Sequence, residues 1–276
     1  MTQILQILLA SDLTKRSRCA LVRAVQLKRA TAAGLTLLHV AEPDLTGELA
    51  KRRGAAATAT MEAHLSDVST GKLRRVLIKF AVGDPVAAIV AQAESRHADL
   101  VVLGQPGKNR RIKELFAGTT AERVIRNSRR PVLVAKVPSD LPYRRVVIAF
   151  DRSGAAQRAL ATALAIAPRA EFHLVYALQS PEAGRGEEEA EPMQVLLENA
   201  AKQVARRSLY RHTKLTIEVR EGAPVHIIAS ALQACDADLL AMGTHGRGRL
   251  QTALFGSVAQ ELLAASQCDV LVTQPQ

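Results

Sequence analysis

The chain alternates short apolar runs with longer stretches in which apolar residues recur at helical spacing. In the first half the apolar runs cover residues 4–10, 35–40, 74–82, 100–104 and 132–137, and the stretches between them cover 17–33, an alanine-rich segment reaching about 69, 85–95 and 119–127. Short Val, Leu and Ile runs separated by helices are typical of strands buried on both faces, and therefore of a parallel sheet. Right-handed crossovers then predict an open, doubly wound α/β domain.

The same pattern occurs a second time. Asp12, which follows the first apolar run, matches Asp151 at an offset of 151 − 12 = 139. Other landmarks keep this offset up to the glycine turn and an offset of 138 beyond it: Gly83 with Gly222, Asp99 with Asp238, Gly104 with Gly243, Gly107 with Gly246, Gly118 with Gly256 and Thr119 with Ser257. The sequence therefore predicts two tandem domains with five parallel strands each, over residues 1–138 and 143–276. Two prolines mark the junction near residues 138–142.

The strongest candidate for a binding site is the glycine-rich segment 242–258 of the second copy. Gly243, Gly246 and Gly248 let backbone N–H groups approach an anion without a Cβ in the way. A glycine-rich turn between a strand and a helix is weak evidence when it stands alone. This segment, however, carries a second group of free amides.

That second group is the start of the following helix. Gly256 and Ser257 place backbone amides and a hydroxyl at a helix N-terminus, where the macrodipole favours phosphate. Arg247 and Arg249 add positive charge in the turn. Asp151 ends the first strand of the same copy, and ligands of doubly wound sheets bind beyond the carboxyl ends of the strands. The sequence therefore predicts a phosphate site in the second copy.

Composition narrows the function classes. The formal charge is 37 − 26 = +11, which favours anionic ligands or an acidic partner. Aromatic residues make up only 3% of the chain, so stacking platforms for nucleic acid are missing and no motif supports nucleic-acid binding. The three cysteines share no metal-like spacing and imply no disulfide. No apolar run is long enough to span a bilayer, and the first ten residues read as a strand, so we expect a cytoplasmic protein.

The spacing Gly243-x2-Gly246-x9-Gly256-Ser257, with Asp151 in Ala-Phe-Asp-Arg-Ser, resembles that of the universal stress protein family. The resemblance covers essentially the whole chain as two tandem family domains. It implies domains of the adenine-nucleotide α-hydrolase-like type, with ATP held by the glycine motif of the second copy. The cofactor-binding residues that it implies are Phe150, Asp151, Ala177, Met242, Gly243, Gly246, Arg247, Gly248, Gly256, Ser257 and Val258.

The resemblance also implies a role and an assembly. The role is that of a nucleotide-dependent regulatory protein in the stress response, with Mg²⁺ or Mn²⁺ bridging phosphate oxygens. The sequence has no carboxylate cluster dedicated to a metal, so the nucleotide itself would supply most of the coordination. No attacking group for phosphoryl transfer is evident, so ATP hydrolysis or autophosphorylation is expected to be slow or absent. The two domains would pair through their last strands as an internal pseudo-dimer, which leaves homodimer formation open. The alternative is a non-nucleotide interaction module that binds another anion, a protein or a nucleic acid through a basic surface.

The first copy departs from the glycine pattern. Ten residues separate Gly107 from Gly118, against nine between Gly246 and Gly256. Pro106 also removes a backbone N–H from the turn. The sequence therefore predicts that the second copy binds nucleotide and that the first is degenerate. The alternative is a weaker second site that would use Asp12, Val40, Gly104, Gly107, Gly118 and Thr119.

Overall fold

The computed structural model describes residues 3–14, 17–41, 47–69, 71, 73–105, 119–178, 195, 197–199, 214–244 and 255–275. The chain divides into two compact units, Ile4–Pro142 and Tyr143–Gln276, with Gln3 grouped with the second. We call them the N-terminal and the C-terminal domain and describe each by itself.

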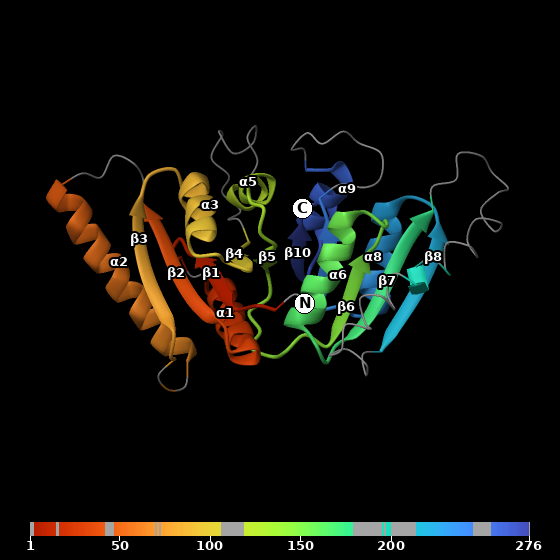
Figure 1. The fold of residues 1–276 in the computed structure, drawn as a ribbon, viewed down its shortest axis with the longest axis horizontal. Helices are drawn as coiled ribbons and strands as arrows, with labels where there is room; N and C mark the ends of the chain where they lie inside the picture. The colour runs from red at the N-terminus through yellow and green to blue at the C-terminus, as the bar shows by residue number, and fades with distance from the viewer. Residues whose placement is uncertain are drawn as a thin grey trace. The chain divides into compact units, whose positions relative to one another are not determined.

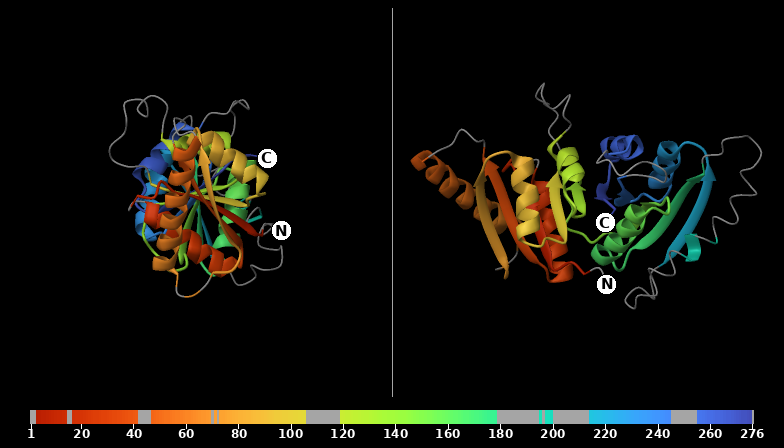
Figure 2. Two further views of the ribbon diagram at one scale, coloured as in Figure 1. Left: turned by 90° about the vertical axis from the view of Figure 1, so that its left-hand side faces the viewer. Right: turned by 45° about the horizontal axis from the view of Figure 1, so that its top comes forward.

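The N-terminal domain is a parallel sheet with helices on both faces (Figure 1). Its strands follow the order β3-β2-β1-β4-β5, and all four neighbouring pairs are parallel. Helices α1 and α2 pack against each other, and so do α3 and α5. Figure 2 shows how α2 runs along β3. The elements are β1 (Gln6–Ala10), α1 (Arg18–Thr31), β2 (Gly34–Ala41), α2 (Gly47–Val68), β3 (Val76–Val82), α3 (Pro85–Ser95), β4 (Leu100–Gly104), α5 (Thr120–Asn127) and β5 (Val132–Ala135).

The C-terminal domain repeats this topology. Its strands follow the order β8-β7-β6-β9-β10, again with parallel neighbours. The elements are β6 (Arg145–Ala149), α6 (Gly154–Ile166), β7 (Glu171–Leu178), β8 (Leu215–Glu221), α8 (Pro224–Ala234), β9 (Leu239–Gly243), α9 (Ser257–Ala265) and β10 (Asp269–Thr273). In each domain the second and third strands lie on one side of the first strand, and the fourth and fifth lie on its other side. The position between the first and fourth strands is therefore the topological switch point, where ligands of such folds bind.

The strands form where the sequence has continuous apolar runs because the sheet is covered on both sides. In β1 and β4, Leu8, Leu9 and Val101 are completely buried, and so are Val147 and Leu240 in β6 and β9. Strands buried on both faces show such uninterrupted apolar sequences rather than alternation. The predicted fold class, two tandem doubly wound α/β domains with five parallel strands each, is confirmed.

One aspartate in each domain joins the amino ends of two neighbouring strands. Asp99 Oδ2 accepts hydrogen bonds from the backbone N–H groups of Leu5 (2.8 Å) and Gln6 (2.9 Å). Asp238 accepts from the backbone N–H groups of Arg144 through Oδ2 (2.9 Å) and of Arg145 through Oδ1 (3.2 Å). These carboxylates satisfy amides that the sheet leaves unpaired at the edge opposite the switch point. They are therefore structural residues.

Two further observations bear on the expectations from composition. Cys19, Cys235 and Cys268 are free thiols. No helix in the described part of the chain combines the length and the apolar character that crossing a membrane requires.

Candidate functional site

The loop after β6 places Asp151 at the switch point of the C-terminal domain. Asp151 Oδ1 accepts a hydrogen bond from the backbone N–H of Ser153 (3.0 Å), and Arg152 between them has a φ of 65°. Ser153 then caps α6, because its Oγ accepts from the N–H of Ala156 (3.1 Å). One oxygen of Asp151 therefore shapes the turn. No described residue donates to the other oxygen, which leaves it available to a ligand.

The N-terminal domain builds the same turn. Asp12 Oδ1 accepts from the backbone N–H (3.0 Å) and the hydroxyl (2.8 Å) of Thr14, and Leu13 has a φ of 61°. A positive φ is uncommon for residues other than glycine. Its recurrence at equivalent positions shows that the strand-end aspartate has a structural role in both copies. The family resemblance had implied only a ligand-binding role for Asp151.

Gly243, at the end of β9, lies against the start of α6. A Cβ at this position would lie 2.7 Å from the Cβ of Ala155 and 3.1 Å from the nitrogen of Ala156. Thr273 reinforces the contact, because its hydroxyl donates to the buried carbonyl of Ala155 (2.6 Å). Close packing of strand against helix is therefore sufficient reason for a glycine here. The predicted approach of this glycine to ribose and phosphate stays a prediction.

The start of α9 offers backbone amides to an anion. Gly256 is its N-cap, and its own N–H donates to the carbonyl of Thr244 (3.0 Å). No described side chain caps this helix, and Ser257 is exposed. The N–H groups of Ser257 and Val258 belong to the first turn, where no intrahelical acceptor exists. Among the described residues none accepts from them, so this turn keeps the free donors and the positive dipole end that suit a phosphate.

The structure brings part of the predicted site together and leaves part outside the described residues. Asp151 and Gly243 lie at the carboxyl ends of neighbouring strands, because Ala149 of β6 lies opposite Met242 of β9. Phe150 and Met242 are each 2% exposed, which leaves them little surface to offer a base. Ala177, near the end of β7, is partly exposed. Gly246, Arg247 and Gly248 fall in the segment 245–254, outside the described residues.

The equivalent crevice of the N-terminal domain is a cavity of about 360 Å³. Such a volume lies within the range of small-molecule sites. Four residues of the predicted weaker site line it, namely Asp12, Val40, Gly104 and Thr119, and Ile89 and Gln105 join them. Gly107 and Gly118 lie outside the described residues. The alignment of the two copies did not predict Ile89 and Gln105. The position of α3 directly after β3 could have indicated Ile89.

Carboxylates close the helix starts beside this N-terminal crevice. Glu122 accepts from the N–H of Thr119 (2.7 Å), while the Thr119 hydroxyl accepts from the N–H of Glu122 (3.2 Å). Asp84 caps α3 by accepting from the N–H of Ala87 (2.9 Å), a bond that lowers the pKa of Asp84, with help from the nearby Arg123. A reciprocal capping box satisfies two of the amides that an anion would otherwise use.

The corresponding helix starts of the C-terminal domain lack such carboxylates. Ala223 is the N-cap residue of α8 and forms no side-chain cap, and Gln260 occupies the position equivalent to Glu122. In the described residues no group of three or more His, Cys, Asp or Glu side chains could hold a metal ion. The C-terminal helix start is therefore the more open of the two toward an anion.

Comparison with known proteins agrees with this architecture. The model of the universal stress protein family matches residues 4–136 and 142–274. A universal stress protein of Methanocaldococcus jannaschii is 30% identical over 140 residues, covering 48% of this chain and 82% of that relative. One of Synechocystis is 25% identical over 178 residues, covering 63% of this chain and 57% of that relative.

Among solved structures, a universal stress protein from Archaeoglobus fulgidus superposes with a TM-score of 0.71 at 20% identity, covering 99% of this chain and 97% of its own. A putative universal stress protein from Pseudomonas aeruginosa gives 0.66 at 22% identity, covering 99% of this chain and 94% of its own. At these identities the structures show a shared fold. With the two matches of the family model, they lead to one conclusion: the chain belongs to the universal stress protein family and carries the family domain twice.

Proposed function

We propose that this protein is a nucleotide-dependent regulatory protein of the stress response that binds ATP, mainly in its C-terminal domain. The observation that carries the proposal is the start of α9. There the amides of Ser257 and Val258 have no described acceptor and no side-chain cap, at the edge of the sheet where Asp151 and Gly243 end their strands. A helix N-terminus at a switch point is a favourable place for phosphates.

Each part of the nucleotide has a proposed neighbour in this crevice. The free oxygen of Asp151 would accept a hydrogen bond from a ribose hydroxyl, as an acidic residue does in dinucleotide-binding folds. Ala177 would lie against the base, and the glycine turn with Gly246 and Arg247 would close on the phosphates. Mg²⁺ or Mn²⁺ would be coordinated mainly by phosphate oxygens and water. Because the sequence offers no evident attacking group and the described part of the site positions none, hydrolysis or autophosphorylation would be slow or absent.

The proposal includes the arrangement of the chain. The domain limits are residues 1–138 and 143–276. The last strands, β5 and β10, would pair the two domains as a pseudo-dimer within one chain, located in the cytoplasm. A closed internal pair imitates the symmetry of a two-subunit assembly.

Isothermal titration of the full chain with Mg-ATP tests the proposal, with Gly246→Val and its matched counterpart Gly107→Val. We expect Gly246→Val to abolish binding, because a branched side chain would obstruct the approach of phosphate, and Gly107→Val to retain it. Loss of binding only in Gly107→Val would place the nucleotide in the N-terminal domain instead. Single-turnover assays with Mg-ATP measure hydrolysis, and turnover comparable to that of a kinase would contradict a regulatory role.

The net charge of +11 favours one competing function, an interaction module that binds another anion or a macromolecule through its basic surface. Absence of any heat of binding with Mg-ATP, in the unaltered chain as in both variants, would favour this alternative.

A further inference from the structure

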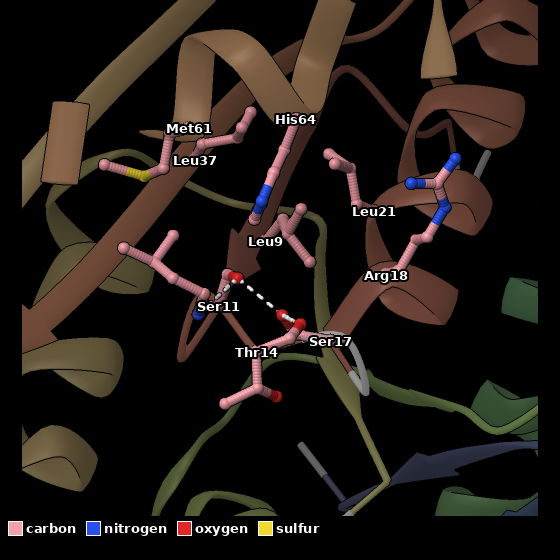
Figure 3. A pocket seen from close by; sticks show the side chains of 10 residues that line it. Leu9, Ser11, Thr14, Ser17, Arg18, Leu21, Leu37, Met61 and His64 are labelled. Carbon is pink, nitrogen blue, oxygen red and sulfur yellow. Dashed lines mark hydrogen bonds between the residues drawn. The ribbon is translucent and has the colours of Figure 1, made fainter. Parts of the chain in front are cut away.

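The N-terminal domain contains a second, smaller cavity of about 100 Å³. It lies between the sheet and helices α1 and α2, with Leu9 of β1 and Leu37 of β2 in its wall (Figure 3). The larger crevice is lined by the next residues along these strands, Ala10 and Leu38, and by α3 and α5. Because successive side chains of a strand point to opposite faces, the two cavities lie on opposite faces of the sheet. We call the smaller one the α1–α2 chamber.

One residue in the lining of the chamber is much smaller than its counterpart in the C-terminal domain. Ser11 stands where the C-terminal domain has Phe150, since the N–H of each follows its first strand and donates to the equivalent carbonyl, that of Leu38 or of Val175. Phe150 is 2% exposed and fills its own domain's interior. The Ser11 hydroxyl instead donates to Ser17 Oγ (2.9 Å), at the border that the chamber shares with the crevice. The serine at this position therefore leaves room that a phenylalanine ring would occupy.

The inner wall of the chamber is apolar. Leu9 and Leu37 of the sheet, Leu21 of α1 and Met61 of α2 form it, and Figure 3 shows the last three around the open space. Leu9, Leu37 and Met61 are no more than 2% exposed. For comparison, an apolar cavity of about 150 Å³ admits benzene. The chamber is therefore the right size for a branched hydrocarbon tail of about four carbon atoms.

The remaining lining residues are Ser11, Leu13, Thr14 and Ser17 and two basic side chains, Arg18 and His64. His64 reaches from α2 into the chamber, with its ring beside Leu9 (Figure 3). Arg18 begins α1 beside the chamber and is exposed; its guanidinium points away from the open space past Leu21 in Figure 3, so it would have to turn about its side-chain bonds to reach a ligand at the mouth. Neither side chain has a hydrogen-bond or ion-pair partner among the described residues, and the chamber's described lining includes no carboxylate. An arginine without a partner beside an apolar wall suits a carboxylate group with a short tail.

We propose that the α1–α2 chamber binds a short branched-chain monocarboxylate, with its hydrocarbon tail among the leucines and Met61 and its carboxylate at Arg18 and His64. The site is independent of the nucleotide proposed for the C-terminal domain. No bond is made or broken in it, so the ligand would act as an effector that signals its own concentration.

Methionine-methyl NMR of the full chain tests the site, with 3-methylbutanoate as the probe. The chain has only four methionines, of which Met61 lines the chamber and Met242 lies in the C-terminal domain. We expect the Met61 signal to shift and saturate with 3-methylbutanoate while the Met242 signal stays in place. Addition of Mg-ATP reports on the C-terminal site through Met242, so the two proposals can fail separately.

Two variants copy the C-terminal domain into the chamber. Ser11→Phe should fill it and abolish the shift of Met61. Arg18→Gln, which introduces the residue found at Gln157, should keep the fold and weaken binding about tenfold, because a charge-assisted hydrogen bond is lost. The uncharged analogue 3-methylbutanol should bind about tenfold more weakly for the same reason. Equal affinity of the alcohol, an unchanged affinity in Arg18→Gln, or a Met61 signal that never moves would each overturn the proposal.

Discussion

Replacing Gly243 by alanine would place a methyl carbon 2.7 Å from the Cβ of Ala155 and 3.1 Å from the nitrogen of Ala156. Non-bonded carbon atoms prefer separations of about 3.5–4.0 Å, so β9 and α6 would have to separate by about 1 Å. The helix cannot move freely, because Ala155 accepts the buried hydrogen bond from Thr273 (2.6 Å). The substitution therefore strains both the packing and a hydrogen bond.

The expected cost follows from these two contacts. Overpacking in a well-packed interior costs about 1–3 kcal/mol, and weakening one hydrogen bond adds about 1 kcal/mol. We expect Gly243→Ala to lower the free energy of unfolding of the C-terminal domain by about 2–3 kcal/mol. With a urea dependence of about 1–3 kcal/mol per molar for a domain of this kind, the midpoint of its unfolding should fall by about 1 M.

Urea unfolding followed by far-ultraviolet circular dichroism is the suitable assay, because the chain has no tryptophan. Gly154→Ala is the matched control. No atom lies within 4 Å of a Cβ added at Gly154, the first residue of the same helix, and alanine favours helices by about 1 kcal/mol over glycine. Its midpoint should stay or rise. A Gly243→Ala variant that unfolds at the same urea concentration as the unaltered chain would refute the close contact.

Three other substitutions have expected outcomes. Tyr143→Phe removes the hydroxyl that donates to the fully buried Asp269 (2.7 Å), and thermal unfolding should show a loss of about 1–3 kcal/mol. Asp84→Asn tests acid sensitivity: the N–H of Ala87 lowers the pKa of Asp84, so its stabilisation is present above the unfolded value near 3.8 and is lost as the pH falls through the folded value. The variant should therefore lose less stability than the unaltered chain between neutral pH and the acid limb. Asp151→Asn keeps an acceptor for the turn, so titration calorimetry should show weaker ATP binding while the melting temperature stays unchanged; equal affinity would exclude a ligand role for the carboxylate.

Where the backbone is dictated locally, the sequence predicted the elements to the residue. Helix α3 was expected at 85–95 and occupies Pro85–Ser95, because proline at its first position and the Asp84 cap define its start. Strand β3 was expected from residue 74 but begins at Val76. Arg75 has a φ of 58°, outside the extended region that a strand requires. A left-handed residue of this kind leaves no mark in a pattern of apolar positions.

The candidate site was predictable in place but not in detail. Strand ends and glycine spacing located Asp151, Gly243 and Ser257 at one edge of the sheet. The reason for glycine at Gly243 could not be read from the chain, because it depends on the distance between β9 and a helix that starts 89 residues earlier. Likewise, the alignment of the two copies shows Ser11 in the first where the second has Phe150. The cavity beside Ser11, however, can be recognised only in the structure.

An anion bound at the open start of α9 would act as the cap of this helix. A helix cap contributes about 1 kcal/mol, and no described side chain supplies one here. Occupancy of the crevice would then decide how often the first turn of α9 frays, and the free energy of that local opening would rise with ligand concentration. A partner that recognises this turn would sense whether the crevice is occupied through the stiffness of the turn alone, without any rearrangement of strands.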